Sequence, residues 1–197
     1  RDGAVASFVR KLDLGDDELH WYTLEVPAWR ALSDFDVTLM RKDPPFDMEY
    51  IYSTYLLELA EEQGARIFNR PAAIRDFNEK LSTAKFPEFM PPTLVTRQEV
   101  LIHEFIEKYG DIILKPLDAM GGSSVFRIQR SDPNLNVIVE TMTQLGARTV
   151  MAQRYIPEIS QGDKRILLID GEPVPYALAR IPKEGETRGN LAAGGKG

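Results

Sequence analysis

The chain has 197 residues, of which 43% are hydrophobic and 27% are charged, and its formal net charge at pH 7 is −6. These values are typical of a globular protein with one domain or two small ones. The acidic balance argues against nucleic acid or an anionic membrane as the main partner, and no apolar run approaches the length of a membrane span. The absence of cysteine excludes disulfides, thiolate metal sites and cysteine nucleophiles, which fits a cytoplasmic protein.

The first 77 residues combine short predicted strands with one strong helix. Residues 4–14 and 21–26 predict strands, and residues 27–33 predict a turn or a short helix. Apolar side chains recur at helical spacing over residues 48–63, and Gly64 follows as a typical stop signal. This pattern predicts a helix that packs by one face.

A charged loop follows the short strand expected at residues 37–40. Two consecutive prolines forbid regular structure there, so Arg41 is presented on a stiff loop at the carboxyl end of a strand. Ligands of open α/β sheets bind at that edge, which makes Arg41 a candidate ligand contact. The alternative is a structural connection with Asp47 as the helix N-cap, and we favour a structural role for Asp43.

Residues 72–84 predict a further helix that carries Lys80, which by itself indicates a solvated helix lysine. Proline-rich residues 87–92 predict a linker. A strand is expected at 93–95, and Thr96 with Glu99 forms a capping-box pattern for the helix that follows.

The central stretch, residues 112–126, predicts two strands joined by a glycine–serine loop. Lys115 closes the first strand, and Gly121, Gly122 and Ser123 lie in the loop. Glycines let backbone N–H groups approach a phosphate chain, and a lysine adds a point charge on a long arm. The alternative is an ordinary hairpin loop with a surface lysine. The glycine patterns of dinucleotide-binding and Walker-type loops are both absent from the chain.

The remaining residues predict a helix over 132–145, a strand over 149–153 and a hairpin of strands 163–169 and 173–180 around an Asp-Gly turn. Residues 181–197 are polar, glycine-rich and aperiodic. They indicate either a mobile lid or a linker.

Five sequence strings together resemble bacterial glutathione synthetase, a family with the ATP-grasp fold; they lie at 41–47, 78–81, 112–117, 162–165 and 186–195. The resemblance implies an α/β protein in which two α+β lobes hold ATP. It divides the chain into part of an N-terminal α/β substrate domain (1–77), a small lid lobe (78–154) and the start of a C-terminal lobe with a mobile loop (155–197). We expect the chain to be an internal piece that lacks both ends.

The resemblance also implies roles for matching residues. The residues expected to contact ATP are Lys80, Lys115, Gly121, Gly122, Ser123, Gln153, Arg154, Tyr155, Ile156 and Asp163. The residues expected to face the reacting phosphate and carboxylates are Arg165, Arg180 and Arg188. The residues expected to contact the peptide substrate are Arg41, Arg188 and Asn190.

The implied reaction joins γ-glutamylcysteine and glycine through an acyl phosphate, with ATP and Mg²⁺. Such chemistry needs cationic groups and no protein nucleophile, which suits a chain without cysteine. The resemblance implies that the Mg²⁺ ligands lie beyond residue 197 and that the enzyme is a cytoplasmic homotetramer. The alternatives are another ATP-grasp carboxylate–amine ligase and a non-catalytic nucleotide-binding domain. A non-catalytic domain would have no need for Arg180 and Arg188, so their presence favours an enzyme.

Overall fold

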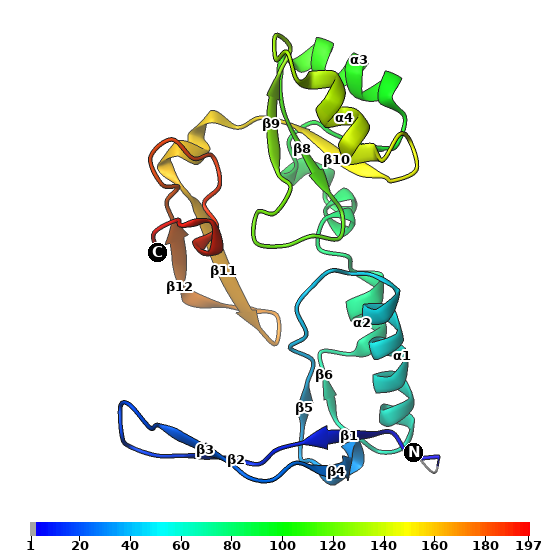
Figure 1. The fold of residues 1–197 in the computed structure, drawn as a ribbon, viewed down its shortest axis with the longest axis vertical. Coiled ribbons are helices and arrows are strands. Elements are labelled where there is room, and N and C mark those ends of the chain that lie inside the picture. The colour runs from blue at the N-terminus through cyan, green and yellow to red at the C-terminus, as the bar shows by residue number, and fades with distance from the viewer. Residues whose placement is uncertain (1–2) are drawn as a thin grey trace. The chain divides into compact units, whose positions relative to one another are not determined.

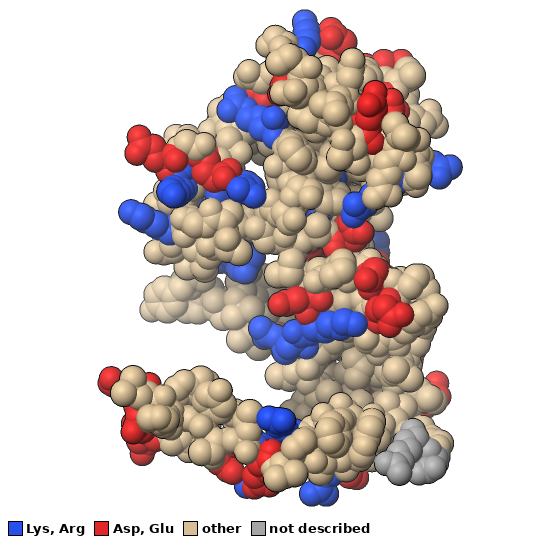
Figure 2. Space-filling view, viewed as in Figure 1, with Lys and Arg blue, Asp and Glu red and all other residues tan. Residues whose placement is uncertain are grey.

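The computed structural model describes residues 3–197, which divide into a first unit that ends at Asn78 and a second unit, Glu79–Gly197. Figure 1 shows the order of the elements along the chain. No helix among the described residues is long and apolar enough to cross a membrane. On the face seen in Figure 2, basic and acidic side chains of the described residues lie interspersed.

The described residues of the first unit contain three two-stranded sheets, two α-helices and a short 3₁₀ helix, Leu32–Asp34. Its elements are β1 (Ala6–Val9), β2 (Leu12–Leu14), β3 (Tyr22–Leu24), β4 (Ala28–Ala31), β5 (Thr38–Leu39), α1 (Met48–Glu62), β6 (Ile67–Phe68) and α2 (Pro71–Asp76). Strands β1 and β4 pair antiparallel, as do β2 and β3, whereas β5 and β6 pair parallel. The small core of this unit consists of Leu32, Ala60, Ala65 and Ile67.

Two predictions for the first unit have different outcomes. The helix expected over 48–63 is confirmed, and the Asp47 side chain accepts a hydrogen bond from the Tyr50 amide at 2.9 Å, as an N-cap does. The turn or short helix expected over 27–33 is wrong for its first half, which forms β4. Pairing with β1 decides this, since Trp29 lies opposite Phe8 and their ring centroids are 5.4 Å apart.

The second unit is built on a four-stranded antiparallel sheet with strand order β7–β10–β8–β9. Its strands and helices are β7 (Thr93–Thr96), α3 (Glu99–Tyr109), β8 (Asp111–Pro116), β9 (Phe126–Gln129), α4 (Leu135–Thr143) and β10 (Val150–Arg154). Both helices cover one face of the sheet (Figure 1). The core between them consists of Ile102, Ile106, Ile112, Leu114, Ile128, Val139, Met142, Val150 and Ala152.

Strand β8 shows how this core positions a charged residue. Ile112 and Leu114 are fully buried against the helices, and the intervening residues are less buried. Successive side chains of a strand point to opposite faces, so Lys115 lies on the face that the helices leave uncovered.

A hairpin of β11 (Asp163–Ile169) and β12 (Glu172–Arg180) completes the regular structure of the second unit. Asp170 and Gly171 both have positive φ angles, of 52° and 83°, which confirms the predicted Asp-Gly turn. Beyond the hairpin, Ile181 pairs with Lys196, so residues 181–196 form a closed loop.

The helix predicted over 72–84 is wrong in its middle. Helix α2 ends at Asp76, and a separate 3₁₀ helix covers Leu81–Lys85, so Lys80 lies between helices. The predicted capping box is also absent. Thr96 remains in β7, paired with Val150, and its hydroxyl accepts from the Gln98 amide at 3.0 Å, so α3 begins only at Glu99. At Thr96, strand pairing with Val150 overrides the local helix-capping pattern.

Candidate functional site

Lys115 is the centre of a polar network on the uncovered face of the sheet. Its Nζ donates a hydrogen bond to Gln153 Oε1 at 2.6 Å, and Gln153 Nε2 donates to Thr93 Oγ1 at 2.9 Å. Burial lowers the pKa of Lys115, and the positive charge of Lys80 lowers it further, while Glu79 opposes the change. A desolvated ammonium beside a second cation favours an anionic ligand.

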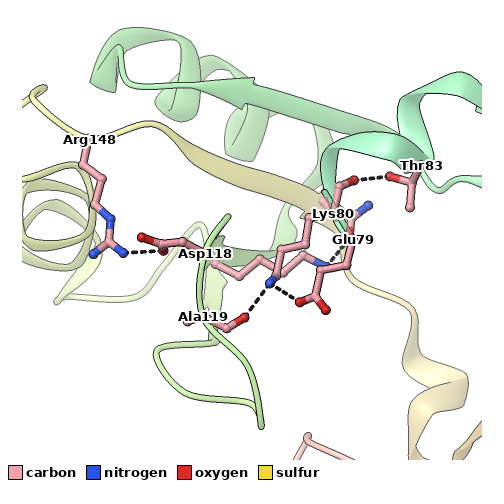
Figure 3. Close-up of polar contacts among 8 residues, drawn as sticks. Glu79, Lys80, Thr83, Asp118, Ala119 and Arg148 are labelled. Carbon is pink, nitrogen blue, oxygen red and sulfur yellow. Dashed lines mark hydrogen bonds and ion pairs between the residues drawn. The ribbon is translucent and has the colours of Figure 1, made fainter. Parts of the chain in front are cut away.

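Lys80 approaches the same place from the segment that precedes the sheet. Its Nζ donates to the Ala119 carbonyl at 2.6 Å and lies 2.9 Å from Glu79 Oε1. Figure 3 shows both contacts. Its side chain is only 15% exposed. The expectation of a solvated helix lysine is therefore wrong. The Thr83 hydroxyl donates to the Lys80 carbonyl at 2.5 Å and holds the backbone of that turn.

The glycine–serine loop lies beside both lysines. Gly121 and Gly122 have φ angles of 66° and 82°, which glycine adopts without strain. An ion pair of 2.5 Å between Asp118 and Arg148 anchors the start of the loop (Figure 3). Sequence analysis did not identify either residue, because nothing in their local pattern indicates a partner 30 residues away.

A pocket of about 210 Å³ lies between the lysines and the loop. Its lining consists of Glu79, Lys80, Lys115, Pro116, Ala119, Met120, Gly121, Gly122, Ser123, Val125 and Asn190. The lining combines two ammonium groups, glycine backbone and one hydroxyl. This set of donors fits a chain of phosphate groups.

A second pocket of about 180 Å³ shares Lys115 and Val125 with the first. Its remaining lining is Pro91, Ile113, Gln153, Arg154, Tyr155, Ile156, Ile159 and Thr187. The amides of Arg154 and Tyr155 already donate to the carbonyls of Pro92 and Asp111, both at 3.0 Å. A largely apolar pocket next to a cationic one fits a ligand with a flat base at one end and charge at the other.

The C-terminal loop closes onto the glycine–serine loop. Arg188 donates to the Gly122 carbonyl at 3.1 Å and to Glu186 Oε2 at 2.6 Å. The Arg188 guanidinium, with the Thr187 amide, lowers the pKa of Glu186 to about 2, so the pair is charged at neutral pH. Thr187, which sequence analysis did not select, lines the second pocket.

Four other predicted residues, Arg41, Asp163, Arg165 and Arg180, lie outside both pocket linings, as Arg188 does. Arg180 is held by Asp163 through two hydrogen bonds, Nε to Oδ1 at 2.7 Å and Nη2 to Oδ2 at 2.6 Å. Arg165 is exposed on β11, opposite Leu178. Arg41 lies on an exposed loop of the first unit, after β5.

The described residues contain no group of three His, Cys, Asp or Glu side chains that is able to hold a metal ion. Asp163 is already engaged by Arg180. The described residues therefore do not fit a magnesium site by themselves.

Two family models match the chain in succession. The model of the prokaryotic glutathione synthetase N-terminal domain matches residues 1–75, and that of the prokaryotic glutathione synthetase ATP-grasp domain matches residues 79–197. The chain belongs to the prokaryotic glutathione synthetase family. The resemblance seen in the sequence strings is thus confirmed.

Curated glutathione synthetases are similar along the whole chain. Those of Nitrosomonas europaea and Shewanella oneidensis are 62% and 60% identical over 200 and 196 residues, which cover 100% of the chain. That of Pseudomonas aeruginosa is 57% identical over 195 residues and covers 99%. In each case the chain spans 62% of the relative's length.

Solved structures share the ATP-grasp fold with this family member. D-cycloserine synthetase DcsG has a TM-score of 0.60 at 17% identity, with 83% of this chain and 65% of that chain covered. D-alanyl-alanine synthetase A from Vibrio cholerae has a TM-score of 0.54 at 14% identity, with 89% and 53% covered. At these identities the likeness shows the fold alone.

The contact between the glycine–serine loop and the C-terminal loop predicts that alanine substitutions at Gly121 and Gly122 affect the C-terminal loop differently. A Cβ at Gly122 would lie 2.9 Å from Asn190 Oδ1 and 3.1 Å from Arg188 Cδ, whereas one at Gly121 would meet only Ala192 Cβ at 3.7 Å. Both substitutions place alanine at positive φ, which costs about 1 kcal/mol. We expect trypsin to cleave after Arg188 faster in Gly122→Ala than in Gly121→Ala. Equal cleavage rates would contradict the contact.

Proposed function

We propose that the protein is an ATP-dependent ligase that joins γ-glutamylcysteine and glycine to give glutathione, ADP and phosphate. The observation that carries the proposal is the pair of adjoining pockets that share Lys115 within a chain of the glutathione synthetase family. In this assignment the adenine occupies the pocket formed by residues 153–156. The phosphates occupy the pocket beside Lys80, Lys115 and the glycine–serine loop.

The lysines would act by exchanging partners. Lys80 now donates to the Ala119 carbonyl and Lys115 to Gln153 Oε1. Phosphate oxygens accept stronger, charge-assisted hydrogen bonds than these neutral acceptors do. ATP would therefore replace both contacts.

The reaction forms an amide in two displacements. The γ-phosphoryl group of ATP transfers to the cysteinyl carboxylate of the peptide, which gives ADP and an acyl phosphate. The glycine amine then attacks the acyl carbon, loses a proton and displaces phosphate. In this proposal the guanidinium of Arg188, which donates to the Gly122 carbonyl, would stabilise negative charge on the transferring phosphate.

Closure of residues 181–197 would protect the intermediate, since an acyl phosphate hydrolyses when water reaches it. The loop is held to the glycine–serine loop through Arg188 and the packing of Asn190 against Gly122. Ligands between the two loops would add contacts to the closed form and so favour it.

The order of the chemical steps predicts an isotope transfer. With oxygen-18 in the cysteinyl carboxylate of γ-glutamylcysteine, one labelled oxygen should appear in the phosphate released during turnover with ATP and glycine. ADP release should require both substrates for sustained turnover. Unlabelled phosphate would rule out the acyl phosphate, and turnover only with other acids and amines would indicate a different ligase of this fold.

A second prediction concerns the shared lysine. Lys115→Met keeps the aliphatic packing but removes a charge-assisted contact worth about 1.5–3 kcal/mol, so ATP should bind about tenfold or more weakly. Calorimetry with the intact protein measures this. Lys108→Met is the matched control, because Lys108 lies over the Tyr109 ring on α3 and lines neither pocket. Unchanged affinity in Lys115→Met would remove Lys115 from the phosphate site.

A third prediction concerns the lid. Trypsin cleavage after Arg188 in the intact protein should be slower with ATP, γ-glutamylcysteine and glycine than without them, because ligands hold the loop closed. Cleavage at an unchanged rate would leave the loop as a connecting segment.

A further inference from the structure

Arg127 lies in a charged cluster on the uncovered face of the sheet, outside both pocket linings. Arg127 pairs with Ile113 across β8 and β9, and Asp111 pairs with Gln129. Arg127 and Asp111 are therefore diagonal neighbours on one face. Arg127 Nε lies 3.1 Å and 3.2 Å from the two Asp111 carboxylate oxygens, and Nη2 lies 2.7 Å from Oδ2.

The same cluster holds Tyr155 at two points. The Tyr155 amide donates to the Asp111 carbonyl at 3.0 Å, which fixes the backbone. The Arg127 guanidinium lies 3.8 Å from the centroid of the Tyr155 ring, within the range of a cation–π contact. Asp111 thus binds the tyrosine through its backbone and orients the arginine through its carboxylate.

The cluster is charged over the whole neutral pH range. Hydrogen bonds from Arg127, with a smaller contribution from Gln129, lower the pKa of Asp111, and the Asp111 carboxylate raises the pKa of Arg127. Gln129 Nε2 also donates to Asp111 Oδ2 at 3.3 Å. A two-point guanidinium–carboxylate pair has a defined plane, so the guanidinium is held at a fixed orientation above the ring.

Tyr155 lines the pocket assigned to adenine, together with its neighbours Arg154 and Ile156. Adenine is uncharged, and its affinity for an apolar pocket depends on how closely the walls fit it. Strand β10 ends at Arg154, and the Tyr155 amide still donates to the Asp111 carbonyl of β8, which holds the backbone of Tyr155 but does not set the orientation of its ring. A contact to the Tyr155 ring itself is therefore needed to hold this wall of the adenine pocket in one orientation.

We infer that Arg127 is a positioning residue for nucleotide binding, which acts through the Tyr155 ring to hold the adenine end of the site in shape. The inference rests on the proposed function. Under this inference Arg127 affects binding of the adenine and not of the phosphates. The pocket assigned to the phosphates is lined by Lys80 and Lys115, and Arg127 is not part of its lining.

The test compares Arg127→Gln with Arg130→Gln in the intact protein. Arg130 follows the same strand and pairs with Glu107 at 3.2 Å, so its substitution removes an equal charge without touching Tyr155. Loss of a cation–π contact of this kind predicts a rise in KM for ATP of about three- to tenfold in Arg127→Gln, with kcat within about twofold. Arg130→Gln should leave both parameters at their original values.

Two further measurements distinguish positioning from general destabilisation. Inorganic tripolyphosphate carries the charge of ATP without adenine, so its inhibition constant should be the same in Arg127→Gln and in the unsubstituted protein. In a Tyr155→Leu background, Arg127→Gln should have no further effect on KM for ATP, because the ring through which it acts is absent.

Each outcome decides the inference. An unchanged KM in Arg127→Gln overturns it, as does an equal loss of tripolyphosphate affinity or an additive effect in Tyr155→Leu. If the unsubstituted protein fails to bind ATP in calorimetry, the proposed function fails. If that protein binds ATP and Arg127→Gln binds it equally well, only the inference fails.

Discussion

The site depends on the two-faced packing of strand β8. Ile112 and Leu114 are buried against α3 and α4. Because successive side chains of a strand point to opposite faces, their burial places Lys115 on the face of the sheet that the helices leave uncovered. Each fully buried aliphatic side chain contributes about 1.5–3 kcal/mol, so a slip of one residue, which would expose both, is strongly disfavoured. The apolar core therefore fixes the position of a charged residue that takes no part in it.

A second constraint is electrostatic. Burial disfavours the charge of Lys115 and lowers its pKa, and the positive charge of Lys80 nearby lowers that pKa further. The fold tolerates this because Glu79, the Ala119 carbonyl and Gln153 accept from the two ammonium groups. Two of these partners, the Ala119 carbonyl and the Gln153 side chain, are neutral, and an anion accepts a stronger hydrogen bond from a lysine than they do.

Two arginines, in contrast to these lysines, are each held by a carboxylate through two guanidinium nitrogens. Arg180 is held by Asp163 and Arg127 by Asp111, each through a two-point contact with a carboxylate. A paired guanidinium serves well as a rigid support and is less available to a substrate. Arg188 is also paired with a carboxylate, that of Glu186, but its other hydrogen bond goes to the Gly122 carbonyl beside the phosphate pocket. The fold decides which partners each arginine has, and a sequence does not show them.

Features with a local cause were determined by the sequence alone. The Asp-Gly turn at 170–171, the helix capped by Asp47 and the alternation of β8 each follow from a few adjacent residues, and the sequence strings sufficed to recognise the family. The tertiary structure decided the break before Lys80, the role of Thr96 as a strand residue and the contact of Arg127 with Tyr155. The contacts of Lys80, Thr96 and Arg127 involve partners that lie 28 or more residues away in the chain, such as Ala119 for Lys80 and Val150 for Thr96. A local pattern carries no information about partners that only the folded chain brings together.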